Sequence, residues 1–464
     1  MNNFSRERFK TGEEYSRALF FLSPFILLFS ISLFQVLNLT LFQGDKYQTI
    51  AESNRIYQKP ISPVRGFIYD RNGTLLAENI VQRDLYVTPA YIEDSAETIL
   101  KLSNLLDVPY ELLDENFSRG VKKVKKFDSF PLVKALNEEQ IAKAKVNLDS
   151  ISGIEVKATL KRYVLHEETL AHVLGYVGDI SSEDIRRDKL LAELQNTQIG
   201  KTGIENEFDY VLRGKPGIQT QERDVKGKLV RILDTQGAED GKDIYLTIDQ
   251  KLQDHLFKLF ENRRGALVAL EPKTGLVRAL ISSPSFNPNI LNSIVDTDEV
   301  ESLFSNKESP IFNRAISGQY PPASTLKPFV GLAAIENEVI SWDKKIKDDG
   351  EFYVEGDPRP YRGWKENGHG RVDMRKAIAE SSDVYFYTIA FELTLAGIRP
   401  MLDSFGFGKK TGLTDFEANG LLPDKKWKLG YKGDFWFKGD TINLGIGQGY
   451  ILATPLQLAM AYSG

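Results

Sequence analysis

The stretch "GQYPPASTLKPFVGLAA", residues 318–334, decides how the second half of this chain folds. Two prolines interrupt the chain, and an apolar helical pattern begins directly after them. Ser324 and Lys327 stand at the start of that pattern, and residues at this spacing share one face of a helix. The spacing therefore predicts that the Lys327 amine reaches the Ser324 hydroxyl.

This pairing has a chemical use. A serine hydroxyl is a poor nucleophile unless a base lies close to it. Lysine normally carries a proton, but burial beside Leu326 and Phe329 and the positive end of the helix dipole both favour the neutral amine. The start of the helix also offers N–H groups to an oxyanion. One helical turn is therefore predicted to hold a nucleophile, its base and part of an oxyanion hole.

The same spacing occurs again at Ser341 and Lys344, among charged residues with no apolar helix behind them. We interpret this second pair as surface. Other serine-enzyme patterns are not found in the sequence, because no G-x-S-x-G occurs and the histidines follow no triad order. The four histidines are His166, His172, His255 and His369.

A second group of polar residues lies downstream, in "DMRKAIAESSDVYFYTIAFEL" (373–393). A helical pattern breaks there at Ser381-Ser382-Asp383. Polar side chains between two helices can point into a cleft. A helix cap explains the same residues equally well, so this stretch read alone leaves both interpretations open.

A long apolar segment lies near the N-terminus. From Ala18 to Gln43 no residue is charged, and about 20 apolar residues span a bilayer. The basic residues before the segment favour a cytoplasmic N-terminus; they are Arg6, Arg8, Lys10 and Arg17. The exit from the segment has no small-x-small cleavage site. We therefore predict a cytoplasmic tail at 1–17 and an uncleaved anchor at 18–42, with a buried core helix as the alternative.

The composition excludes several function classes. The 464 residues carry a net charge of −5, so no basic surplus indicates nucleic acid. The absence of cysteine excludes disulfides, thiolate metal sites and a cysteine nucleophile. At a typical domain size of about 150 residues, this length predicts about three domains.

Turn signals and periodicity divide the rest of the chain. Alternating residues around Asn72-Gly73 predict a hairpin, and a second hairpin is predicted at 265–286. Helical patterns cover much of 93–148 and of 202–217. We place a domain boundary near residue 238, in "TQGAEDGKD".

Together these segments resemble the penicillin-recognising serine enzymes, and most closely the elongation-type class B penicillin-binding proteins. Ser324-Thr325-Leu326-Lys327 is similar to the S-x-x-K motif of that family, and Ser381-Ser382-Asp383 is similar to its S-x-N motif, in the form with aspartate third. The resemblance covers nearly the whole chain through further segments in the same order: "RGFIYDRNGTLLAEN", "GKTGIENEFDYVLRGKPG", "WKENGHG", "FGFGKKTGLTDF", "GLLPDKKWK" and "GDTINLGIGQGYILATPLQLAMAY".

The resemblance implies an α+β fold with an N-terminal transmembrane helix. A pedestal domain of mixed strands and helices, elongated and of the dimerisation type, is expected over 45–238. A penicillin-binding, serine β-lactamase-like transpeptidase domain is expected over 239–464, with a central antiparallel sheet and helices. The implied location is the inner (cytoplasmic) membrane, crossed once, with the N-terminus in the cytoplasm and the catalytic domain on the periplasmic side.

The resemblance also implies a reaction, the D,D-transpeptidation that cross-links peptidoglycan during cell-wall elongation. Ser324 would attack the penultimate D-alanine carbonyl of a stem peptide, with Lys327 as its base. Ser381 would relay protons near the leaving group, and Asp383 would help to hold the substrate. The amine of a neighbouring stem peptide would then take the acyl group. Penicillins and other β-lactams mimic the D-Ala-D-Ala end and trap the acyl-enzyme.

The implied partners follow from this role. They are peptidoglycan stem peptides, β-lactams, the membrane, a membrane glycan polymerase of the shape and elongation family, and rod-complex proteins. No cofactor and no nucleic acid is expected.

The third family motif, K-[ST]-G on a strand, is expected after the other two. Lys-Thr-Gly occurs at Lys201–Gly203, Lys273–Gly275 and Lys410–Gly412, but the first two precede Ser324. The third follows Ser381 closely and is continued by the loop-like "LTDFEANGLLPDKKW". None of the three therefore qualifies, and we expect the transpeptidase domain to be incomplete at its C-terminus, truncated before the third motif.

A metal is a separate question, because some relatives are thought to bind zinc near the active site through carboxylates, a histidine and a cysteine. Asp348 and His369 resemble two of those positions, whereas Gly363 and Ser382 stand at the other two. With no thiol and one carboxylate missing, no zinc site is expected, and His369 is expected to be structural.

Two functions remain open from the sequence. One is a D,D-transpeptidase acylated at Ser324; a β-lactam sensor or a β-lactamase on the same fold is a variant against which the long pedestal argues. The other is a membrane-anchored scaffold of the elongation complex whose catalytic domain no longer turns over. Labelling with a fluorescent penicillin discriminates between the two.

Overall fold

The structure is a computed structural model. It describes residues 4–38, 55–122, 124, 126–147, 151–189, 191, 194, 198–224, 229–260, 263–292 and 297–464. The chain divides into two compact units. One unit combines Met1–Ser62 with Pro216–Ala238, and the other combines Pro63–Lys215 with Glu239–Gly464.

The first unit contains one long helix and one small sheet. Helix α1 (Phe4–Leu37) is continuous through Pro24, and its part Phe20–Leu37 is long and apolar enough to cross a membrane by length and composition. The end of the anchor predicted at 18–42 lies outside the described residues. The sheet is antiparallel in the order β1-β8-β9. Its strands are β1 (Ile56–Ile61), β8 (Gly217–Arg223) and β9 (Leu229–Gln236).

The second unit begins with a five-stranded sheet built on the predicted hairpin. Gly73 has a φ of 83°, a value that glycine adopts without strain, and the chain reverses there between β2 and β3. The strand order is β10-β2-β3-β4, and β5 also pairs with the long strand β3. These strands are β2 (Ile68–Tyr69), β3 (Leu75–Val87), β4 (Phe130–Val133), β5 (Ile154–Val164) and β10 (Ile244–Tyr245).

Helices α3 (Ser95–Leu106), α4 (Tyr110–Val121) and α5 (Glu138–Asn147) pack with this sheet. Asp94 caps α3 by accepting a hydrogen bond from the N–H of Glu97, which explains why the helix begins there. The helical pattern predicted over 93–148 is therefore largely confirmed, but it is interrupted by strand β4, which the sequence reasoning missed.

A smaller group of elements connects this sheet to the rest of the unit. Strands β6 and β7 form an antiparallel pair, and the short helices α8 and α9 contact β7. These elements are α6 (Glu167–Leu174), β6 (Val177–Asp179), α7 (Ser182–Arg187), β7 (Gln198–Gly200), α8 (Gly203–Glu207) and α9 (Asp209–Arg213). The single helix expected within 202–217 is therefore wrong, because the chain breaks between α8 and α9 at Phe208.

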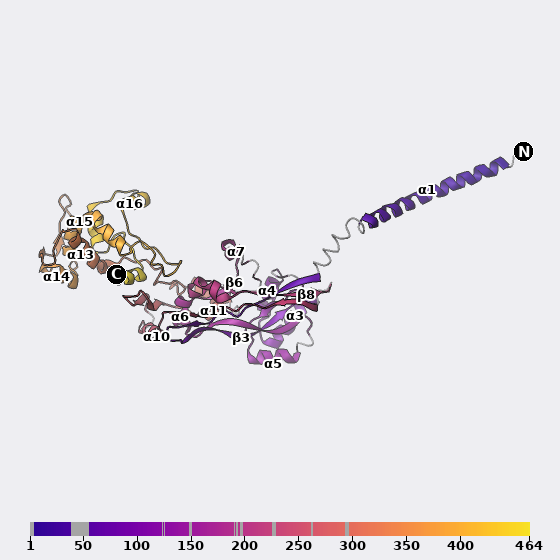
Figure 1. The fold of residues 1–464 in the computed structure, drawn as a ribbon, viewed down its shortest axis with the longest axis horizontal. Helices are drawn as coiled ribbons and strands as arrows, with labels where there is room; N and C mark the ends of the chain where they lie inside the picture. Colours follow the sequence, from indigo (N-terminus) through magenta and orange to yellow (C-terminus); the bar gives the residue numbers. More distant parts are fainter. Residues whose placement is uncertain are drawn as a thin grey trace. The chain divides into compact units, whose positions relative to one another are not determined.

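Helices dominate the remainder of the second unit, around one apolar core. Strands β11 (Gly265–Leu270) and β12 (Val277–Ser283) form the predicted hairpin. Helix α15, most of whose apolar residues are buried, packs against α13 and α17, and α13, α14 and α15 lie together in Figure 1. The helices are α10 (Gln250–Leu259), α11 (Pro288–Asn292), α12 (Thr297–Ser305), α13 (Lys327–Glu336), α14 (Met374–Ala379), α15 (Asp383–Ser404), α16 (Lys425–Lys432), α17 (Lys438–Gly445) and α18 (Pro455–Ala461).

Two short antiparallel pairs complete the unit. They are β13 (Ile346–Asp348) with β16 (Gly370–Val372), and β14 (Glu351–Phe352) with β15 (Tyr361–Arg362). The predicted α+β fold class is confirmed by this mixture of sheets and helices. The boundary placed near residue 238 stays a prediction.

Candidate active site

Ser324 lies on a turn that the surrounding chain holds at the surface. A 3-10 turn (Ala323–Leu326) leads directly into α13, so the apolar pattern is helical as predicted, with a tighter first turn. Leu326 and Phe329 are buried in the core, whereas Ser324 is exposed. The N–H of Ala323 donates to the carbonyl of Gly447 at 2.8 Å. The turn is therefore anchored on its inner side and presents the serine outward.

Ser381 lies where two helices meet. Helix α14 ends at Ala379, and α15 begins at Asp383 with Ser382 as its N-cap, accepting a hydrogen bond from the N–H of Tyr385 at 3.2 Å. Ser381 itself has a φ of 54°, which is uncommon for a residue other than glycine and marks a tight reversal. The cap interpretation is confirmed at Ser382, whereas its neighbours Ser381 and Asp383 form hydrogen bonds with the Lys327 amine; that these side chains point into a cleft stays a prediction.

The four residues singled out from the sequence meet in one hydrogen-bonded cluster. Lys327 Nζ donates to Ser381 Oγ at 2.9 Å, to the Ser381 carbonyl at 2.9 Å and to Asp383 Oδ1 at 2.7 Å. Ser381 Oγ lies 2.9 Å from Ser324 Oγ. In the described residues no hydrogen bond joins Lys327 directly to Ser324, so the direct contact predicted from their spacing is wrong. Ser381 Oγ is hydrogen-bonded to both residues and so stands between them.

The surroundings of Lys327 favour loss of its proton. Its side chain is only 1% exposed. Burial lowers the pKa of Lys327 below its ordinary value of 10.5, although the hydrogen bond and the charge of Asp383 oppose this shift. An amine needs a lowered pKa to act as a base near neutral pH.

We expect acylation of Ser324 to depend on this ionisation. The rate should rise with pH, because the fraction of neutral Lys327 rises, and its midpoint should lie below 10.5, because burial lowers the pKa. The measurement is the second-order rate constant for labelling by a fluorescent penicillin between about pH 6 and about pH 10. A rate that does not change over this range would contradict a lysine base.

Trp364 is a neighbour of the cluster that the sequence reasoning missed. Its backbone N–H donates to Asp383 Oδ2 at 3.0 Å, and its indole N–H donates to the Ser381 carbonyl at 3.1 Å. The residue is 66% exposed, so an open aromatic face borders the cluster. The segment "WKENGHG" pointed to a family pattern, but no local feature indicated these two hydrogen bonds.

Gly447 allows the close backbone approach behind Ser324. It has a φ of 72°, and a Cβ atom built on it would lie 2.0 Å from the Ala323 carbonyl oxygen. An alanine there would have to push the turn that carries Ser324 away from its position. Glycine is the one residue type that has no Cβ to cause this collision.

Gly447→Ala is therefore expected to lower both the unfolding midpoint and the rate of acylation, the latter by about tenfold or more. Gly433→Ala is the matched control, since Gly433 has a similar φ of 68° and open space around its Cβ. Both substitutions carry the left-handed backbone cost of about 1–2 kcal/mol. Thermal unfolding and penicillin labelling of the two variants check this. Equal effects of the two would contradict the role given to the collision.

The three Lys-Thr-Gly segments each lie in a turn or loop. Thr202 of the first precedes α8, the second connects β11 to β12, and the third has no strand structure. In the third, Thr411 Oγ1 donates to Glu417 Oε2 at 2.8 Å. None of the three segments therefore lies on a strand of the described structure.

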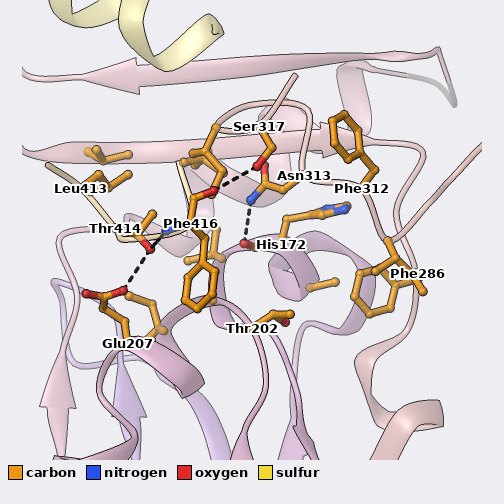
Figure 2. Close-up of a pocket in the computed structure, with 18 of the residues that line it drawn as sticks. His172, Thr202, Glu207, Phe286, Phe312, Asn313, Ser317, Leu413, Thr414 and Phe416 are labelled. Atoms are coloured by element: carbon orange, nitrogen blue, oxygen red, sulfur yellow. Dashed lines mark hydrogen bonds between the residues drawn. The ribbon is translucent and has the colours of Figure 1, made fainter. Parts of the chain in front are cut away.

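A cavity of about 530 Å³ also lies in the second unit. None of the four residues of the cluster lines it. Figure 2 shows hydrogen bonds that join its walls, from Thr414 Oγ1 to Glu207 Oε2 at 3.0 Å and from Asn313 Nδ2 to the His172 carbonyl at 3.1 Å. Burial lowers the pKa of His172 to about 4, so its imidazole is uncharged at neutral pH. The polar groups of this cavity are thus used to hold its walls together, and the reactive cluster lies elsewhere.

Two protein-family models match the chain. The penicillin-binding protein dimerisation domain matches residues 60–246, and the penicillin-binding protein transpeptidase domain matches residues 265–464.

Curated relatives are similar over most of the chain. The peptidoglycan D,D-transpeptidase MrdA of Acinetobacter baumannii is 38% identical over 425 residues, which are 91% of this chain and 63% of the relative. MrdA of Escherichia coli K12 is 36% identical over 453 residues, which are 96% of this chain and 71% of the relative. The chain thus spans roughly two thirds of the length of these relatives.

A solved structure shares the fold. In the complex between penicillin-binding protein 2 (PBP2) and MreC from Helicobacter pylori, one chain matches with a TM-score of 0.78 and 30% identity. The match covers 87% of this chain and 76% of that one. The chain therefore belongs to the penicillin-binding protein family and, within it, to the branch of penicillin-binding protein 2.

Proposed function

We propose that this chain is a D,D-transpeptidase that cross-links peptidoglycan through an acyl-enzyme at Ser324. The observation that carries the proposal is the line of three polar atoms from Ser324 Oγ through Ser381 Oγ to Lys327 Nζ, with 2.9 Å at each step. The relatives named peptidoglycan D,D-transpeptidase support it.

In the first half of the reaction Ser324 gains a bond to carbon. Lys327 must first be neutral, and its burial lowers its pKa in that direction. The Ser381 hydroxyl then rotates to donate to Nζ and to accept from Ser324. Ser324 Oγ attacks the penultimate D-alanine carbonyl carbon while its proton passes through Ser381 to Lys327. The tetrahedral intermediate collapses, the C–N bond breaks, and the leaving D-alanine amine takes the proton back.

In the second half the amine of a neighbouring stem peptide attacks the ester. Its proton moves to Lys327, the ester C–O bond breaks as the new amide forms, and Lys327 returns that proton through Ser381 to the leaving Ser324 Oγ. A β-lactam undergoes the first half alone. Its leaving amine stays attached to the acyl group after the ring opens, so the ester persists.

The neighbouring groups have separate roles in this scheme. Asp383 accepts from both Lys327 and the Trp364 backbone, which places its carboxylate beside the reacting groups, where it helps to hold substrate. The N–H of Ser324 lies in the first turn of its helix, whose N–H groups have no partner within the helix. We assign it as one oxyanion donor.

The proposed location follows from α1. We propose that the N-terminus lies in the cytoplasm, that the helix crosses the inner membrane once and that the catalytic residues lie on the outer face; the apolar length of α1 and the basic residues before it support this. The pedestal is assigned to 45–238 and the transpeptidase domain to 239–464. The proposed partners are stem peptides, β-lactams, a membrane glycan polymerase and rod-complex proteins; an H. pylori relative has been solved in a complex with MreC.

A second candidate, kept from the sequence, is a membrane-anchored scaffold of the elongation complex. In this case the serine cluster would be present but too slow to turn over.

A cross-linking assay tests the proposal. The protein is incubated with a pentapeptide donor ending in D-Ala-D-Ala and an amine acceptor stem. Released D-alanine and the cross-linked product are measured by mass spectrometry. We expect both to form in equal amounts. Folded protein that forms neither product and takes up no fluorescent penicillin would support the scaffold instead.

A further inference from the structure

A buried polar network lies behind Ser381 and Asp383. Its members are Asp348, His369 and Ser382, each at most 9% exposed. Asp348 Oδ2 accepts from Ser382 Oγ at 2.6 Å and lies 2.6 Å from His369 Nδ1. Asp348 Oδ1 accepts from the N–H of Gly350 at 2.9 Å. The carboxylate thus joins three different segments of the chain.

These residues do not fit the zinc site that some relatives are thought to have. A structural zinc ion takes four ligands, usually thiolate, imidazole or carboxylate. In the described part of the chain no group of three or more histidine, cysteine, aspartate or glutamate side chains is placed to hold a metal ion. Asp348 and His369 bond directly to each other, and the position expected for a thiol holds the hydroxyl of Ser382.

The network fixes the start of helix α15. Ser382 Oγ donates to Asp348 and also accepts the N–H of Tyr385 as the helix cap, so its single hydroxyl is held from two sides. Ser382 lies between Ser381, whose φ of 54° is strained, and Asp383, which pairs with Lys327. A small shift of Ser382 would move both neighbours away from Lys327.

The charge of Asp348 strengthens these bonds. Burial alone would raise the pKa of Asp348, but the hydrogen bonds from Ser382, His369 and Gly350 outweigh it and lower that pKa. The carboxylate is therefore ionised at neutral pH and is a strong acceptor. An ionised carboxylate only accepts, so His369 must carry a proton on Nδ1.

We propose that Asp348, His369 and Ser382 are positioning residues that hold Ser381 and Asp383 against Lys327 by hydrogen bonds, without a metal ion. The inference rests on the proposed function, because its effect is on the acylation of Ser324. In this chain the imidazole N–H of His369 and the hydroxyl of Ser382 hold the three segments together by hydrogen bonds. A bound metal ion would hold them together through bonds to its ligands.

The test compares two substitutions of His369. His369→Ala removes the Nδ1 donor, and we expect acylation at saturating penicillin to slow by about 10- to 100-fold. His369→Asn places an amide N–H near the same point and should restore most of the rate. A zinc ligand would not be rescued in this way, because an amide does not replace an imidazole as a ligand. The exposed His255→Ala on α10 is the matched control and should label at the wild-type rate.

Metal content is measured on the same folded protein by elemental analysis. We expect well under one zinc per chain and no change in acylation with 1,10-phenanthroline. One zinc per chain, lost together with labelling on chelation, would overturn the inference. So would wild-type labelling by His369→Ala, or folded His369→Asn that stays as slow as His369→Ala. If the wild-type protein itself takes up no penicillin, the proposed function fails. The metal content then still tests whether Asp348, His369 and Ser382 are held together without zinc.

Discussion

Ser324→Ala is expected to abolish covalent labelling by a fluorescent penicillin, with a loss of at least about 10⁴-fold. The reason is that Ser381 Oγ, the hydroxyl hydrogen-bonded to Ser324, is held by Lys327 at 2.9 Å and lies on the strained turn before α15, so we do not expect it to take the acyl group instead. The measurement is in-gel fluorescence after a time course with the purified protein.

Ser341→Ala is the matched control, because Ser341 begins the second S-x-x-K segment and is exposed. It should label as the wild type does. Both variants should unfold at the wild-type temperature, since neither hydroxyl lies in the core. Labelling that survives in Ser324→Ala would move the nucleophile to another residue.

Lys327→Met is expected to slow acylation by about 10³-fold. Methionine has nearly the same volume and fits the buried space, but it has no lone pair that takes the proton passed on by Ser381. It also leaves the Asp383 carboxylate without its ion pair, which is 2.7 Å long in the native protein. The rate constant for penicillin acylation at saturation measures the loss.

Lys344→Met provides the comparison for a lysine at the same motif position on the surface. It should leave the rate unchanged. Lys327→Arg adds a second check, because a guanidinium keeps the positive charge but does not give up its proton. If Lys327→Arg retained the wild-type rate, the charge of residue 327 would matter and its basicity would not.

The local parts of this structure could be predicted from the sequence. The hairpin at Asn72-Gly73 and the apolar helix after Ser324 each depend on neighbouring residues. The same holds for α1, since its helical length and apolar composition can be read from the sequence.

The predictions that failed concern segments whose structure depends on contacts with distant parts of the chain. The helix expected within 202–217 breaks at Phe208, and the next residue makes contacts outside its own helix: Asp209 Oδ1 accepts from Arg65 and from the N–H of Gly200, both at 2.8 Å. Strand β4 pairs with β3, whose residues are more than 40 positions away, so no local period marks it.

In the candidate site, too, the local features could be predicted and the long-range contacts could not. Spacing placed Ser324 and Lys327 on one helix, and the resemblance added Ser381 and Asp383. Ser381 Oγ stands between Lys327 and Ser324. These two contacts join residues 54 and 57 positions apart in the chain, respectively. The two hydrogen bonds of Trp364 and the approach of Gly447 to Ala323 are also long-range, and no pattern in the sequence carried them.

The central claim is that the Ser324 oxygen forms the bond to the acyl carbon, and peptide mapping tests it most directly. The wild-type protein is treated with penicillin, digested and analysed by tandem mass spectrometry. We predict one adduct, with the full mass of the opened penicillin, on the peptide that contains Ser324. An adduct on Ser341 or Ser381 instead, or no adduct on protein shown to be folded, would contradict the claim.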